Sequence, residues 1–328
     1  MSVGAELLVE PEPTIEDVAV VPGEITARSP WQLFWRRFRS DRVAMVSLAF
    51  IVLLLLVAIF AGPIVHLIGV TGPNQPNLNA LDAFGQPTGP SSAHPFGVDK
   101  GLGRDVLARV IYGARVSLEV AFIATGIAVF IGVLIGTISG YFRGWIDSIL
   151  ARIMDVMLAF PILLLAIGLA SACSLGKGCL NGLITPGRVT LIVVIALSSW
   201  PYIGRIIRGQ TLSLREKEFV ESARSLGASN ARIMRREILP NLVAPIIVYT
   251  SLILPTNILY EAALSFLGVG VQPPTASWGQ MIADASGVFD TAWWYMVFPG
   301  VALVLTVLAF NLVGDGLQDA LNPKIGRS

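Results

Sequence analysis

The chain has 328 residues, of which 54% are hydrophobic and 14% charged, and its formal net charge at pH 7 is +1. A mean hydropathy of +0.71 is far from the average of soluble globular domains, so the composition predicts an all-α integral membrane protein. The near-neutral charge gives no indication of nucleic-acid binding.

Residues 1–30 are polar, acidic and proline-containing, and we expect them to form a mobile cytoplasmic tail. Aromatic residues then recur at three- and four-residue spacing beside several arginines: Trp31, Phe34, Trp35 and Phe38. This pattern predicts an interfacial amphipathic helix, which forms one unit over 31–62 with the first apolar run. The segment before this apolar run is too long to be the basic region of a signal peptide, so the run is predicted to be an uncleaved membrane anchor.

Six apolar runs are long enough to cross a bilayer, since about 20 helical residues cover its hydrocarbon core. They lie at about 43–61, 117–139, 156–172, 189–204, 242–267 and 292–313. Six crossings place both termini on one side. Arginines before the first run and within 205–236 predict that this side is the cytoplasm, because Lys and Arg are enriched in cytoplasmic loops.

Residues 63–112 are predicted to form an extracytoplasmic loop and a lead-in helix that starts near Gly103. Four basic residues in this loop and directly after it depart from the charge rule: Lys100, Arg104, Arg109 and Arg115. We keep the assignment because long loops follow the rule weakly. His66 and His94 have no further ligand nearby, so we expect surface histidines and no metal site.

The core transmembrane domain is predicted over 113–316, with a cytoplasmic tail over 317–328. Four glycines recur every four residues and predict a close helix–helix contact: Gly132, Gly136, Gly140 and Gly144. Prolines that kink helices lie in or beside the apolar runs: Pro161, Pro201, Pro245, Pro255 and Pro299. Cys173 and Cys179 lie in one short outside loop. They either form a disulfide with each other or remain two free thiols, and the sequence allows both.

The polar segment 213–241 between the fourth and fifth runs is predicted to form a compact helix–turn–helix on the cytoplasmic side. Ser213 and Glu216 have the spacing of a capping box, which predicts a helix from about Leu214. The face of this helix is predicted from three residues at spacing four and three: Phe219, Ala223 and Leu226.

Gly227 is predicted to end the first helix of this segment, because glycine readily adopts the left-handed conformation. Either Ser229 or Asn230 is expected to cap a second short helix, which should stop before Pro240.

The segment resembles the EAA coupling loop of ABC-importer permeases, whose pattern is Glu-Ala-Ala, three residues, Gly, nine residues, Ile, one residue and Leu-Pro. Ser222 replaces an alanine and Glu237 replaces the isoleucine, although Ile238 lies next to it. The resemblance assigns coupling to an ATPase to these residues: Glu221, Ala223, Gly227, Leu239 and Pro240.

A wider resemblance, over about 30–325, is to the C-type permease of oligopeptide and dipeptide importers. Its landmarks occur in order: Phe96 to Asp99, Gly103 to Val106, Tyr112 to Leu118, Gly204 to Gln210, Leu264 to Gly268, Ser277 to Gly279, and Gly314 to Leu321. The resemblance implies the six-helix type I ABC importer permease fold in a bacterial cytoplasmic membrane.

The partners implied by the resemblance are a second homologous permease, two cytoplasmic ATP-binding subunits and an extracytoplasmic solute-binding protein. The chain has no Gly-x4-Gly-Lys-Ser/Thr phosphate loop. We therefore expect a non-catalytic subunit that binds no cofactor, with ATP and Mg used by the partner subunits. Membrane lipid and a peptide substrate complete the expected partners.

Ionisable residues inside a membrane are costly and indicate function by default. Asp155 is expected to pair with Arg152, and Asp315 with the charged tail. Glu261 is a candidate for the outer gate together with Trp278, although a local cap is equally open.

The function favoured is thus the permease of an ATP-driven importer for oligopeptides or dipeptides. An ATPase-independent carrier or channel for small solutes is the alternative. That function predicts an inverted internal repeat or a line of intramembrane charges, and the sequence shows neither. A membrane enzyme would need a convergent polar site, and the ionisable residues are too scattered. The exact substrate is open, because relatives also move nickel chelates and glutathione.

Overall fold

The structure is a computed structural model that describes residues 30–174 and 187–321. Its helices, in chain order, are α1 (Pro30–Ser40), α2 (Arg42–Ile59), α3 (Ala61–Ile68), η2 (Leu78–Ala80), α4 (Val106–Tyr141), α5 (Trp145–Ala159), α6 (Ile162–Ser174), α7 (Arg188–Leu214), α8 (Glu218–Ser225), α9 (Asn230–Ile233), η4 (Met234–Ile238), α10 (Leu239–Phe266), α11 (Trp278–Ser286) and α12 (Trp293–Leu321). η2 is a 3₁₀ turn and η4 is π-helical. Within the described residues the fold is helical, with two isolated β-bridges in the loop before α4.

Five of these helical stretches are long and apolar enough to span a bilayer: α2, α4, α7, the run from α9 to α10, and α12. A sixth candidate is the pair made of α5 and residues Leu163–Leu169 of α6, which meet the same criterion together and are bent by 92° at the break near Pro161. The six predicted apolar runs therefore correspond to five long helices and one broken pair. The other four prolines lie inside α7, α10 and α12, as expected.

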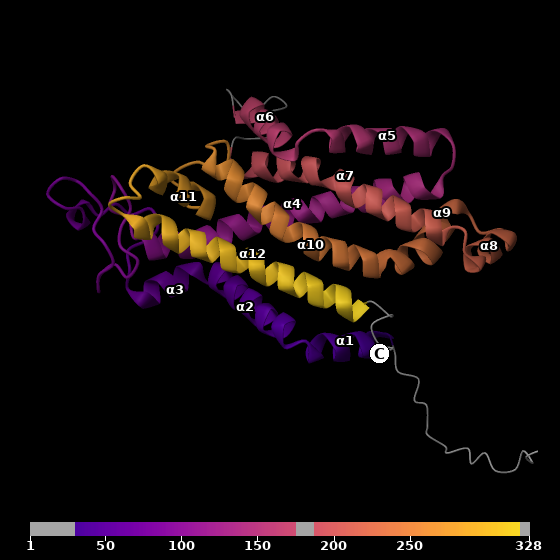
Figure 1. Ribbon diagram of the computed structural model, residues 1–328, viewed down its shortest axis with the longest axis horizontal. Helices are drawn as coiled ribbons and strands as arrows, with labels where there is room; N and C mark the ends of the chain where they lie inside the picture. Colours follow the sequence, from indigo (N-terminus) through magenta and orange to yellow (C-terminus); the bar gives the residue numbers. More distant parts are fainter. Residues whose placement is uncertain (1–29, 175–186, 322–328) are drawn as a thin grey trace, which may run out of the picture.

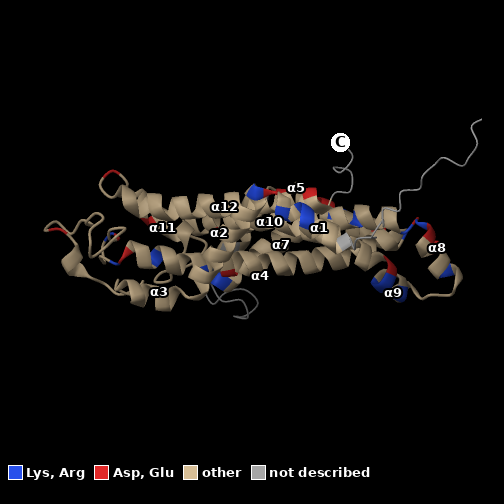
Figure 2. Ribbon diagram, turned by 90° about the horizontal axis from the view of Figure 1, so that it is seen from below, with Lys and Arg blue, Asp and Glu red and all other residues tan. Residues whose placement is uncertain are grey.

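The bundle is elongated, and its two ends are built differently (Figure 1). α8 and α9 lie at one end, and α3, α11 and the loop before α4 lie at the other. Charged side chains gather at α8 and α9, in the loops of the opposite end and around α5 and α1, whereas long stretches of the other helices carry none (Figure 2). This distribution is typical of a chain whose middle lies in hydrocarbon.

Side-chain caps fix where two of the spanning helices begin. Asp41 accepts hydrogen bonds from the backbone N–H groups of Val43 and Ala44, at 2.9 and 3.1 Å. Asp105 accepts from the N–H of Ala108 at 2.8 Å, so α4 begins at Val106, slightly later than the sequence predicts. The amphipathic helix α1 is confirmed.

The predicted glycine contact is formed between α4 and α7. A Cβ atom added at Gly136 would lie 2.5 Å from the carbonyl oxygen of Gly204, and added carbons at Gly132 and Gly140 would be equally crowded by α7. Gly144 does not take part, because it precedes α5 with φ +83° and open space around it. The two backbones thus touch along one face of each helix.

A buried polar contact joins three helices in the middle of the bundle. Asn257 of α10 donates to Thr125 Oγ1 of α4 at 2.9 Å and accepts from the Ser199 hydroxyl of α7 at 2.8 Å. All three side chains are buried. Because each bond satisfies a polar group in an apolar environment, this cluster acts as a joint between helices.

We predict that Gly136→Ala destabilises the protein by about 1–3 kcal/mol, since its methyl group would overlap the backbone of α7. Gly126→Ala on the same helix is the matched control, because nothing lies within 4 Å of the added carbon. It should be neutral or stabilising by up to about 1 kcal/mol. Thermal unfolding of the two purified variants measures the difference, and equal midpoints would contradict the contact.

Candidate coupling site

The polar segment between α7 and α10 begins later than the capping box predicts. Ser213 lies in the last turn of α7, and α8 starts at Glu218 with Lys217 at its N-cap. The prediction was wrong because buried residues, Ile207 and Thr211, hold the end of α7 helical against its neighbours. Tertiary packing here overrides a local start signal.

The turn between α8 and α9 follows the prediction. Gly227 has φ +80°, and its N–H donates to the carbonyl of Arg224 at 3.0 Å. The left-handed conformation explains why glycine stands there. Of the two possible caps, Ser229 is the one observed, since its hydroxyl accepts from the N–H of Arg232 at 3.4 Å.

The second helix does not stop before Pro240, contrary to the prediction. Helical backbone continues from α9 through η4 into α10, so that Asn230–Phe266 forms one 37-residue stretch. Pro240 is tolerated because it lies in the first turn of α10. Ile238, beside the unusual Glu237, is fully buried and supplies the apolar contact at this position.

The buried face of α8 differs from the one predicted. Val220 is fully buried and packs in one cluster with Ile233, Ile238 and Tyr141. Ala223 is half-buried, whereas Phe219 and Leu226 are exposed, Leu226 by 87%. The helix is therefore anchored by Val220 and carries a free apolar residue at its tip.

Hydrogen bonds tether this segment to the end of α4. The Tyr141 hydroxyl donates to Asn230 Oδ1 at 2.8 Å, and the Arg215 guanidinium donates to the carbonyls of Gly140 and Tyr141, at 2.8 and 3.3 Å. Glu216 pairs with Arg143 and, at 3.1 Å, with Arg215.

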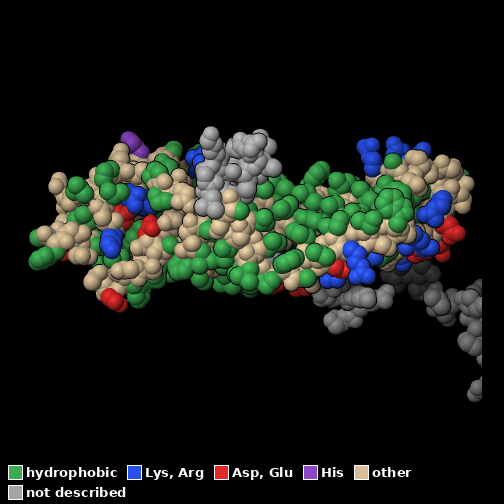
Figure 3. Space-filling model, turned by 90° about the horizontal axis from the view of Figure 1, so that it is seen from above, with side chains coloured by type: hydrophobic (Ala, Val, Ile, Leu, Met, Phe, Trp, Pro, Cys, Tyr) green, Lys and Arg blue, Asp and Glu red, His purple; other side chains and the backbone are tan. Residues whose placement is uncertain are grey.

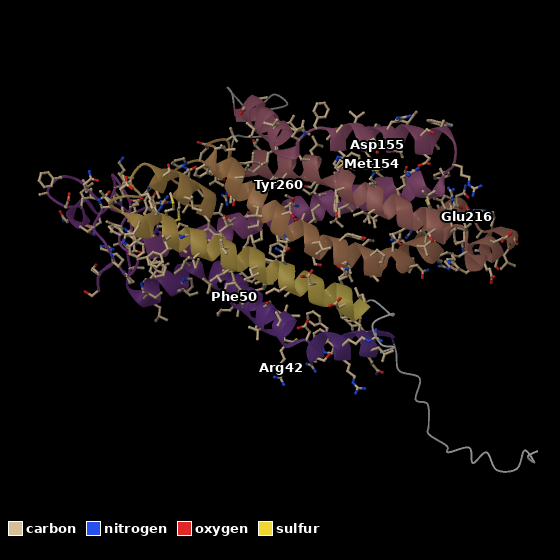
Figure 4. All side chains as sticks on the ribbon, in the orientation of Figure 1. Arg42, Phe50, Met154, Asp155, Glu216 and Tyr260 are labelled. Atoms are coloured by element: carbon tan, nitrogen blue, oxygen red, sulfur yellow. The ribbon has the colours of Figure 1, made fainter. Side chains whose placement is uncertain are left out.

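Glu216 lies at the connection between α7 and α8 (Figure 4). The Arg143 and Arg215 guanidinium groups lower the pKa of Glu216 below its usual value. The pairing therefore stabilises above the unfolded pKa of Glu216 and is lost as the pH falls through the folded one.

The other predicted coupling residues lie on the surface of the same segment. Glu221 is exposed on α8, and Leu239 and Pro240 are exposed at the start of α10. The structure thus brings the five residues into one compact unit at the end of the bundle. Their role in coupling stays a prediction.

The candidate gate residues are buried together at the opposite end. The Ser265 hydroxyl donates to Glu261 Oε1 at 2.9 Å, and Oε2 has no partner among the described residues. The N–H of Trp278 donates to Ser117 Oγ at 3.3 Å, and its indole N–H donates to the carbonyl of Val110 at 3.0 Å. Both side chains are fully buried, so they close a contact between α4, α10 and α11.

Two predictions, the partner of Asp155 and the exposure of His94, are corrected. Asp155 pairs with Arg205 of α7 at 2.7 Å instead of Arg152, so the bond joins two helices (Figure 4). His94 is buried, and its Nδ1 lies 2.8 Å from Asp105 Oδ2, so it is no surface histidine. His66 is exposed, as expected.

Some predictions fall outside the described residues. The side chain of Cys173 and all of Cys179 belong to this group, and so do the tail proposed as partner of Asp315 and residues 1–29.

Two ionic clusters were missed by sequence reasoning. Asp147 of α5 binds Arg208 of α7 through both oxygens, at 2.6 and 2.8 Å. At the other end, the buried carboxylate of Asp99 lies 2.6 Å from Arg104 and 3.7 Å from Arg109. Burial raises the pKa of Asp99, and Arg104 opposes this shift. Two of the four basic residues that break the charge rule, Arg104 and Arg109, are therefore paired with a buried carboxylate of the loop.

The long apolar helices and the polar segments at both ends of the bundle are those of a polytopic membrane protein. One end also carries a helix–turn–helix that is tethered to the bundle. The chain belongs to the family of binding-protein-dependent transport system inner membrane components, whose model matches residues 132–327. Residues 29–84 match the N-terminal TM domain of oligopeptide transport permease C.

Curated relatives include the glutathione transport system permease protein GsiD of Escherichia coli O6:K15:H31 and that of Shigella boydii serotype 4. Each is 46% identical over 298 residues, which cover 91% of this chain and 92% of the relative. Two structures titled inward facing conformations of the MetNI methionine ABC transporter match with TM-scores of 0.55 and 0.53, at 19% and 20% identity. They cover 66% and 65% of this chain and 97% and 96% of theirs, and they show the fold.

The chain is thus the permease subunit of an ABC importer, a multi-pass membrane protein and a non-catalytic subunit. Membership of this family implies ATPase and binding-protein partners.

We predict that Val220→Ala loosens α8, since loss of a buried side chain costs about 2 kcal/mol. Limited trypsin digestion of the assembled complex should then cut faster after Arg224, which is exposed on the same helix. Leu67→Ala on α3 is the control, because Leu67 is exposed, lies at the other end of the bundle and changes stability by about 0.5 kcal/mol or less. Equal cleavage of both variants would mean that Val220 does not anchor the helix.

Proposed function

We propose that this chain is one of two homologous permeases in an importer for short peptides, glutathione among them, with α8 as the helix that engages the ATPases. The permease would form half of the translocation pathway, with both termini and α8 in the cytoplasm. One observation supports the coupling role most directly: α8 is anchored to the bundle by the buried Val220, while the apolar Leu226 at its end is exposed to solvent. The glutathione permeases supply the substrate class.

The contacts of α8 support the proposal that this helix moves together with the bundle as a rigid body. Val220 fixes the helix to the bundle, and the Tyr141–Asn230 bond fixes the turn that follows it. A displacement imposed on α8 is therefore passed to α4 and α7 because the tethers leave the segment little freedom to move alone. Closure of the ATPase pair would supply that displacement.

The tip of α8 has the chemistry of a docking contact. Leu226 is 87% exposed in a stretch that also presents Glu221 and Arg224 to solvent. A strongly exposed apolar side chain beside charged ones is the pattern of an interface anchor next to a polar rim. A groove on each ATPase would receive it.

The substrate class is inferred from the names of similar proteins and from the chemical uniformity of the peptide backbone. A relative that is 46% identical over 91% of this chain is named a glutathione permease, and the N-terminal match is to an oligopeptide permease domain. A peptide backbone offers the same donors and acceptors in every sequence. We therefore expect uptake of glutathione and other short peptides, with the choice among them made largely by the binding protein.

The test is uptake and ATP hydrolysis by the complex reconstituted with its co-encoded partners. Leu226→Ala should lower ATP hydrolysis stimulated by loaded binding protein by roughly tenfold or more, since truncating a central interface anchor costs about 2 kcal/mol. Leu67→Ala is the matched control, because Leu67 is also 87% exposed but lies at the other end, on α3.

Three outcomes of this experiment are informative. Equal activity of the two variants would reject α8 as the coupling helix. Coupled hydrolysis without uptake of glutathione, di- or tripeptides would reject the substrate class and leave the coupling role intact. Uptake that needs no ATPase would favour the carrier alternative.

For the gate, we predict that Trp278→Ala raises ATP hydrolysis in the absence of binding protein. The substitution keeps the backbone N–H that bonds Ser117, but it removes the buried indole and its hydrogen bond to the carbonyl of Val110. The contact of α11 with α4 is thereby weakened, and the outward-open state should be favoured. Leu67→Ala again serves as the control. Unchanged basal hydrolysis in a complex that still assembles would assign Glu261 and Trp278 a purely structural role.

A further inference from the structure

A groove that is open along one side lies between α4 and the stretch from α9 to α10. Its volume is about 600 Å³, and its walls are almost entirely apolar. One wall is a stripe of α4 that includes Phe130, Leu134 and Ile138, and the other includes Met234 and Ile246. Phe130 and Leu134 are 69% and 51% exposed, so the groove is an apolar surface without a partner in this chain.

The groove has the length of one lipid leaflet. Its α4 wall extends from Gly126 to Ile138, which is about 18 Å of helix at 1.5 Å per residue. One half of the hydrocarbon core is about 15 Å thick. An acyl chain that enters at the α9 end would therefore be covered along its length.

Basic side chains stand at the mouth of this groove. Arg235 lines both the groove and a second, adjoining cavity of about 460 Å³, which Arg232 and Arg236 also line. Basic side chains project at this end of the molecule beside a broad apolar surface (Figure 3). Apolar walls and a cationic mouth thus form one continuous site.

The three arginines lack counter-charges. No ion pair links any of them to an acidic group among residues 30–174 and 187–321, although Glu237 follows directly in sequence. Arg235 and Arg236 follow Arg232 by three and four residues along continuous helical backbone, a spacing at which like charges repel each other. A phosphate group placed between them would remove this repulsion and accept their hydrogen bonds.

We propose that this groove is a binding site for an anionic phospholipid, with its phosphate held by Arg232, Arg235 and Arg236 and one acyl chain along α4. A basic pocket between membrane helices at the bilayer surface is the arrangement that recognises anionic headgroups. The site joins α4 to the start of α10, directly behind the coupling segment. The bound lipid stabilises this junction, independently of which solute is carried.

The test uses the complete complex in phosphatidylcholine vesicles that contain a phosphatidylglycerol probe with a diazirine near the end of one acyl chain. After illumination, mass spectrometry locates labelled peptides. Label is expected in 126–138 and 239–246, well above that from a phosphatidylcholine probe of the same chain length.

The variant Arg232→Gln/Arg235→Gln/Arg236→Gln should reduce this preference roughly 100-fold, since each basic residue at an anionic surface contributes about 1 kcal/mol. Arg115→Gln, at the other end of α4, is the matched control and should leave the label unchanged. Leu134→Trp keeps the arginines and fills the groove, so it should also abolish the label. This variant covers the case in which the triple variant fails to assemble.

Other outcomes overturn the proposal. Equal labelling by both probes would show ordinary contact with bulk lipid. Absence of label in the wild-type complex would show that a protein partner, such as the second permease, covers the groove. Label that survives the triple substitution would show that the arginines do not select the headgroup.

Discussion

The contact between the backbones of α4 and α7 is the constraint on which the rest of the structure depends. In a membrane, helices gain nothing from leaving water, so they associate through close packing and hydrogen bonds. Gly132, Gly136 and Gly140 permit this packing because any side chain there would overlap α7. The same contact brings the ends of the two helices together, where Arg215 donates to the carbonyl of Gly140. The coupling segment is placed by that meeting of helix ends.

Polar contacts then act as joints between helices that are otherwise apolar. Asn257 links α10 to the α4–α7 pair in the middle of the bundle, and Asp147 and Asp155 link α5 to α7. Each acidic group is paired with an arginine of a neighbouring helix, which meets the high cost of an isolated charge near hydrocarbon. Asp155, a charge that the sequence places inside a spanning segment, thus joins two helices.

Much of the fold was predictable because the relevant signals are local. Hydropathy locates the spanning helices, the four-residue glycine spacing locates a contact face, and Gly227 locates a turn through its left-handed backbone. The prediction failed where distant residues decide. Ser213 stays inside α7 because buried neighbours extend that helix. The pair of His94 with Asp105 depends on the path of a loop that no periodic pattern describes.

The unbroken helical stretch from Asn230 to Phe266 has a mechanical consequence. Its 37 residues measure about 55 Å, so one secondary-structure element begins at the coupling segment and ends beside the buried carboxyl of Glu261. A push received at its first turn is delivered to the far membrane surface without crossing a loop. The π-helical turn η4 and the two prolines inside α10, Pro245 and Pro255, are points where such a stretch can bend. Stiffness along this stretch therefore determines how much of a displacement at one face reaches the other.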